Sequence, residues 1–122
     1  MYISDILVKR EEIMAKWLGV AAAAALVMGV SQAQAADMPP LAKKSGCTAC
    51  HAIDKKVVGP AWGDVAKRYK GDAGAKAALI AKVKKGGKGN WTEVTKGVPM
   101  PPYSPRVADA DIEQLVDFVL GL

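Results

Sequence analysis

The chain has 122 residues and a formal net charge of +5 at pH 7, from 17 lysines and arginines against 12 aspartates and glutamates. It contains two cysteines and one histidine, which are too few thiol and imidazole ligands for a structural zinc site. A basic chain with few aromatic residues favours an acidic docking partner or an anionic surface. Nucleic-acid binding has little support, because the lysines are scattered over predicted helices and no recognised binding motif accompanies them.

The first segment, residues 1–35, is predicted to be a cleavable signal peptide. An apolar run over residues 17–30 follows Lys16, and small alanines at positions 33 and 35 match the needs of a signal peptidase. A retained membrane anchor is the alternative, but the run is shorter than the ~20 residues that a bilayer requires. Met14 would start a more ordinary signal and is an alternative initiator. We therefore expect export to the periplasm and a mature domain over residues 36–122.

A first short helix is expected over residues 39–46, because proline is tolerated in a first helical turn. It leads into Cys47-Thr48-Ala49-Cys50-His51, the most specific motif of the chain. The two thiols lie about one helical turn apart, so both can reach the two vinyl groups on one edge of a porphyrin. His51 follows directly and can offer a ring nitrogen to the iron. The motif predicts one haem c bound covalently through Cys47 and Cys50.

A dithiol oxidoreductase without haem is the competing interpretation of the two cysteines. A thioredoxin-like site would be expected within an alternating pattern of strands and helices, which is absent around this motif. Without haem, a domain of this size would also have too little core to be stable.

Two helices are expected next, over residues 61–70 and 73–85, each ended by glycine. The second shows the clearer amphipathic spacing, with Ala75, Leu79, Ile80 and Val83 on one side. A long loop rich in glycine and proline follows over residues 88–106.

Met100 lies in this loop between prolines and is the predicted second axial ligand of the iron. The chain has no second histidine, and within residues 36–122 the other thioether is Met38, at the start of the domain. The flanking prolines lower the freedom of the loop, and a His/Met pair raises the reduction potential. A methionine that only fills the core, and a lysine ligand, are the alternatives.

The last helix is expected over residues 109–120, where apolar residues recur at i, i+3, i+4, i+7 and i+8 from Ile112. No segment alternates as a strand would. The mature domain is therefore predicted to be all-α.

Together these residues resemble the small bacterial monohaem class I cytochromes c of the cytochrome c-551/c-552 type. The resemblance spans essentially the whole mature chain and rests on residues 41–62 (LAKKSGCTACHAIDKKVVGPAW), 87–91 (GKGNW) and 98–102 (VPMPP). It implies four to five short helices wrapped around one covalently attached haem, with the first and last helices crossing. Small Ser45 and Gly46 would permit that crossing.

The resemblance also implies roles for single residues. The carbonyl of Pro60 would accept a hydrogen bond from His51, Trp91 would donate its indole N–H to a haem propionate, and Lys82 would balance propionate charge. Trp62 and Tyr69 would pack on the haem. The chain departs from the family in a longer segment between Trp91 and Met100, and in Tyr103, where the family often has an asparagine able to donate to the methionine sulfur.

The predicted function is a monomeric periplasmic one-electron carrier between respiratory donors and a terminal reductase or oxidase, not an enzyme. Lys55, Lys56, Lys85 and Lys88 would steer it to an acidic patch on redox partners. A haem peroxidase or a gas-binding sensor is the alternative if Met100 leaves the iron free.

Overall fold

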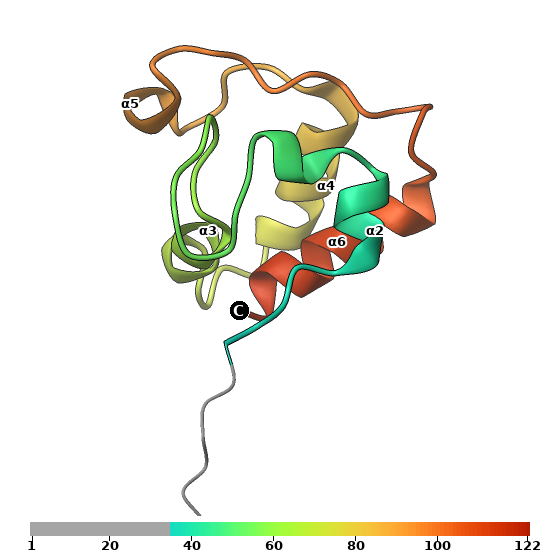
Figure 1. Cartoon of the computed structure of the whole chain (residues 1–122), viewed down its shortest axis with the longest axis horizontal. Helices are drawn as coiled ribbons and strands as arrows, with labels where there is room; N and C mark the ends of the chain where they lie inside the picture. The colour runs from blue at the N-terminus through green and yellow to red at the C-terminus, as the bar shows by residue number, and fades with distance from the viewer. Residues whose placement is uncertain (1–34) are drawn as a thin grey trace, which may run out of the picture. The chain divides into compact units, whose positions relative to one another are not determined.

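The computed structural model describes residues 35–122, which form one compact unit (Figure 1). The predicted signal peptide, except for its last residue, lies outside the described residues. The helices, in chain order, are α2 (Pro40–Lys44), the 3₁₀ turn η1 (Cys47–Ala49), α3 (Trp62–Arg68), α4 (Ala75–Lys85), α5 (Thr92–Thr95) and α6 (Asp109–Leu120). Two isolated β-bridges are the only extended pairing in this part of the chain, so the all-α prediction is confirmed. Within the same residues, no helix has both the length and the apolar character needed to cross a membrane.

The C-terminal helix α6 packs against three other helices, α2, α3 and α4. Four residues of its predicted apolar stripe are buried, and the fifth, Leu120, is half-buried. Leu115 and Val119 belong to a cluster with residues of α2, η1 and α3, and Ile112 and Val116 belong to a second cluster with Tyr103. One amphipathic helix therefore joins both halves of the core.

The contact between α2 and α6 includes a small residue that was not predicted for it. Ala42 of α2 is fully buried in the cluster that contains Leu115 and Val119. A Cβ built on Gly46 would meet nothing within 4 Å among the described residues, so the prediction that Gly46 permits the crossing is wrong. Gly46 has φ +81°, and the left-handed turn between α2 and η1 is what requires glycine there.

Helix α5 was not predicted, because it is a single turn inside the proline- and glycine-rich loop. Its sequence, Thr-Glu-Val-Thr, has mostly β-branched residues of modest helix propensity and is too short to show a helical period. It ends at Lys96 and Gly97, both with positive φ.

Ion pairs on the surface connect α4 to α6. The Nζ of Lys76 lies 2.9 Å from carboxylate oxygens of both Glu113 and Asp117, and the Nζ of Lys84 lies 2.9 Å from Asp109. Such exposed pairs add little stability, but they match the register in which the two helices pack.

Candidate haem site

The two cysteines of the motif open onto one cavity. The η1 turn and the bond from the His51 amide to the Cys47 carbonyl, at 2.9 Å, give the motif its helical spacing. Neither cysteine forms a disulfide within the described residues, and both line the cavity. Cys47 is buried, and burial raises the pKa of its thiol.

The ring of His51 is held by the loop that follows it. The Nδ1 of His51 lies 2.9 Å from the carbonyl oxygen of Pro60. A carbonyl oxygen can only accept, so Nδ1 carries the proton and Nε2 keeps its lone pair for a metal. Burial lowers the pKa of His51, although the bond to Pro60 acts in the opposite direction. The imidazole is therefore neutral at pH 7, as an iron ligand must be.

Gly59 makes this position of the ring possible, a role that was not predicted for it. A Cβ at residue 59 would lie 2.5 Å from Cε1 and 2.9 Å from Nδ1 of His51. The Gly59 amide also donates to the Cys50 carbonyl at 2.8 Å, which folds the loop back onto the motif. The backbone of Gly59 is thus one wall of the histidine site.

Met100 lines the same cavity as His51 and the two cysteines. An antiparallel bridge fixes its backbone: the Gly87 amide donates to the Met100 carbonyl at 2.8 Å, and the Met100 amide donates to the Gly87 carbonyl at 3.0 Å. Gly86 lies so close to this segment that a Cβ there would come 2.7 Å from the nitrogen of Pro102. The sequence predicted Gly86 and Gly87 only as the end of a helix. Two adjacent glycines were a signal for this close approach as well.

The other thioether, Met38, is half-buried against the first core cluster and does not line the cavity. Of the two candidate methionines, the fold therefore brings Met100 to the cysteines and His51.

Lys82 and Trp91, the residues predicted to face propionates, also line the cavity. The side chain of Lys82 runs against Gly89, where a Cβ would lie 2.7 Å from its Cε. Gly89 has φ +61°, a left-handed conformation that glycine adopts easily. Its missing Cβ also leaves the space that the side chain of Lys82 occupies.

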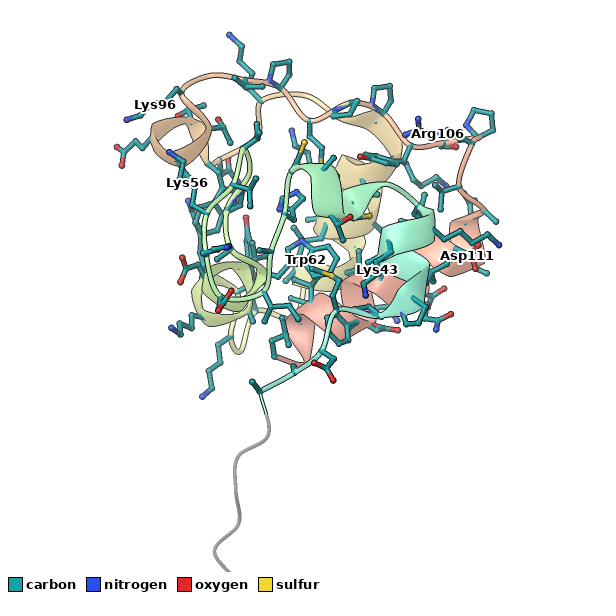
Figure 2. All side chains as sticks on the ribbon, viewed as in Figure 1. Lys43, Lys56, Trp62, Lys96, Arg106 and Asp111 are labelled. Atoms are coloured by element: carbon teal, nitrogen blue, oxygen red, sulfur yellow. The ribbon has the colours of Figure 1, made fainter. Side chains whose placement is uncertain are left out.

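Much of the remaining cavity wall is apolar or aromatic, although Lys88, Asn90 and Thr95 also line it. Trp62 lies with its ring centroid 5.8 Å from that of His51 and points into the interior in Figure 2, and Tyr69 also lines the cavity. Tyr103, the departure from the family pattern, is 6% exposed and packs in the second core cluster. Burial raises the pKa of its hydroxyl, and the guanidinium of Arg106 lies 4.8 Å from its ring centroid.

These residues fit a covalently bound haem. Two thiols at one edge, an imidazole with a free Nε2 and a thioether face one apolar cavity, which are the groups that attach and ligate haem iron. Among the described residues no group of three or more histidine, cysteine or acidic side chains could hold another metal ion.

Comparison with known proteins identifies the family. A model of the cytochrome c family matches residues 35–122. The chain is 50% identical over 95 residues to cytochrome c-551 of Allochromatium vinosum, covering 78% of this chain and 95% of that one. It is 45% identical over 107 residues to cytochrome c-552 of Nitrosomonas europaea, covering 87% of this chain and 95% of that protein.

The fold agrees with a solved structure of the same kind. The crystal structure of wild-type Nitrosomonas europaea cytochrome c552 matches with a TM-score of 0.60 and 44% identity, over 67% of this chain and 95% of that one. The dithiol oxidoreductase interpretation is thereby excluded. As a relative of electron-carrier cytochromes, the chain is an electron carrier and not an enzyme, and it binds one haem c covalently through Cys47 and Cys50. The chain belongs to the class I monohaem cytochromes c, close to cytochromes c-551 and c-552.

Proposed function

We propose that this cytochrome is a periplasmic one-electron carrier whose iron is ligated axially by His51 and Met100. The observation that carries the proposal is that both side chains line one cavity, where Pro60 holds the ring of His51 and a bridge to Gly87 holds the backbone of Met100. When bound, haem c supplies the Fe(III)/Fe(II) couple, which takes up one electron and releases one electron.

The protein keeps the two ligands in place between oxidation states. Pro60 orients the imidazole and makes it more basic, and the bridge to Gly87 fixes the Met100 backbone. Most residues of the cavity wall are apolar, and the soft thioether favours the reduced iron. Nε1 of Trp91 and Nζ of Lys82 would meet the propionates.

The docking surface of the proposed carrier lies at the cavity mouth. Val58, Val98 and Lys88 line the cavity and are exposed, and Val57 is exposed beside Val58. Figure 2 shows Lys56 and Lys96 on the outside of the molecule. An apolar patch with lysines around it fits a partner with an acidic rim, which the net charge of +5 would attract over a distance. The electron would go to a terminal reductase or oxidase.

Export and maturation belong to the same proposal. The family match begins at residue 35, which supports cleavage of residues 1–35 and a mature domain over residues 36–122. The mature protein is proposed to be a monomer. The three basic and three acidic residues of the signal cancel, so the mature chain keeps the whole positive charge.

The ligand assignment is tested with the haem-loaded protein and Met100→Ala. The wild type should show the far-red absorption band of sulfur-ligated ferric haem, and its reduced form should resist carbon monoxide at neutral pH. Met100→Ala should lose the band, bind carbon monoxide rapidly and have a lower reduction potential. Rapid binding by the wild type would favour the peroxidase or sensor alternative. An unchanged band in Met100→Ala would mean that another thioether, such as that of Met38, is the sulfur ligand. A wild type without the band would instead favour a nitrogen ligand such as cavity-lining Lys82 or Lys88.

A further inference from the structure

Arg68, the last residue of α3, contacts a segment of chain far from it in sequence. Its Nη1 donates to the carbonyl oxygen of Asn90 at 3.0 Å. Its Cζ also lies 4.6 Å from the ring centroid of Trp91, so the guanidinium covers the indole in a cation–π contact. Arg68 itself is not a cavity residue, whereas Trp91 lines the cavity.

The segment that Arg68 contacts has little local support of its own. Gly87 and Gly89 precede it with positive φ, in backbone regions that glycine enters and leaves easily. Trp91 is the N-cap of α5, and its carbonyl accepts the amides of Val94 and Thr95 at 2.9 Å. No side chain caps this turn, and one turn of helix is unstable in isolation. Contacts with other elements must therefore hold Trp91 in the cavity wall.

We propose that Arg68 is a positioning residue that holds the Trp91 indole in the wall of the haem cavity. The planar guanidinium suits this because it can stack on a ring and donate from its edge to a carbonyl at the same time, which a lysine ammonium does poorly. Any effect of Arg68 on electron transfer would act through Trp91 and therefore rests on the proposed function, in which Trp91 meets a haem propionate. The neighbouring cation Lys67 gives the contrast: it is 84% exposed and lies 4.0 Å from Asp64 of its own helix.

The test compares Arg68→Ala and Arg68→Lys with Lys67→Ala, which removes the same charge from the next position of α3. In the reduced haem-loaded protein, NMR measures the chemical shift of the Trp91 indole N–H and its hydrogen exchange, together with exchange of the Val94 and Thr95 amides. A Trp91→Phe variant assigns the indole signal. Because the haem ring current depends on distance, the shift reports the position of the indole and not overall stability.

Arg68→Ala should shift the indole signal and accelerate exchange about tenfold, which is the effect of losing one cation–π contact and one hydrogen bond to a carbonyl, both at an exposed site. Arg68→Lys should lie between this variant and the wild type, and Lys67→Ala should match the wild type. The same indole shift and exchange in Arg68→Ala and Lys67→Ala would overturn the assignment. The carbon monoxide test on the wild type is separate: if the wild type bound carbon monoxide while Arg68→Ala still accelerated exchange, the His/Met ligation would fail and the role of Arg68 would stand.

Discussion

Gly59→Ala should disrupt the histidine side of the haem site through a single methyl group. The added Cβ would lie 2.5 Å from Cε1 of His51, whereas ordinary contacts begin near 3.4 Å, so the ring must move by about 0.9 Å. Pro60 adjoins Gly59 in sequence, and a shift of this size away from the loop lengthens the 2.9 Å bond from Nδ1 beyond hydrogen-bonding range. Residue 59 does not have a positive φ, so the cost is steric and not one of backbone conformation.

The expected loss of stability follows from these two contributions. Overpacking costs about 1–3 kcal/mol, and the lost hydrogen bond costs about 0.5–1.5 kcal/mol. Together they give a loss of about 1.5–4.5 kcal/mol, whereas the whole stability of a small domain is about 5–15 kcal/mol. The imidazole would also become less basic once Nδ1 loses its acceptor, which should shift the visible spectrum.

The assay is guanidinium unfolding of the haem-loaded protein, followed by far-ultraviolet circular dichroism, with the visible spectrum recorded before unfolding. Gly74→Ala is the matched control, because its Cβ would meet only Asp72, at an ordinary 3.4 Å, and its φ is −88°. That variant should stay within about 0.5 kcal/mol of the wild type. If Gly59→Ala behaved like Gly74→Ala in both stability and spectrum, the close approach of Gly59 to His51 would not matter and the reasoning would be refuted.

Gly86→Ala should displace the Met100 segment from the end of α4, because the added Cβ would lie 2.7 Å from the nitrogen of Pro102. On heating, the far-red band should therefore disappear at a lower temperature than in the wild type. Equal midpoints of this thermal loss, measured by absorbance, would contradict the prediction. Lys76→Gln should lower stability slightly, because hydrogen bonds to Glu113 and then Asp117 raise the pKa of this lysine. Because the pKa of Lys76 is higher in the folded protein than in the unfolded chain, its ion pairs contribute their full stabilisation at pH values below the unfolded pKa. This stabilisation is lost as the pH rises through the folded pKa, so the stabilities of wild type and Lys76→Gln should converge only in strong alkali. Denaturant unfolding of both proteins at several pH values measures this difference in stability. Equal stabilities near neutral pH would count against the ion pairs of Lys76 with Glu113 and Asp117. His51→Ala should fail to mature into stable holoprotein, measured as haem-stained yield; a normal yield would contradict the ligand assignment.

Sequence reasoning succeeded where the information is local. The spacing of Cys47, Cys50 and His51 is fixed within five residues, so the motif could be read without knowing the fold. The helix predicted over residues 109–120 is α6, and its apolar stripe from Ile112 to Val119 is buried. A long periodic segment predicts both the type of element and the face that it buries. Helix α5 was missed because four residues cannot show a period.

The roles of the glycines could not be read in the same way. Gly46, predicted to allow a helix crossing, serves a left-handed turn, while Ala42 makes the contact with α6. Gly59 and Gly86 looked like ordinary loop and helix-end residues, yet the ring of His51 and the Met-Pro-Pro segment lie against them. Sequence shows that a glycine lacks a side chain, but not which distant group occupies the space that this leaves.

By itself, the sequence determined the haem attachment motif, the all-α class and the candidate axial residues, because each depends on neighbouring residues or on the small number of candidate ligands. Only the tertiary structure decided how these residues are held. It placed Nδ1 of His51 on Pro60, paired Met100 with Gly87 and set Arg68 over Trp91. The last two contacts join residues more than ten positions apart, and the first needs the loop after His51 to fold back on itself. Their distances follow from the packing of the helices and loops and not from any periodicity along the chain.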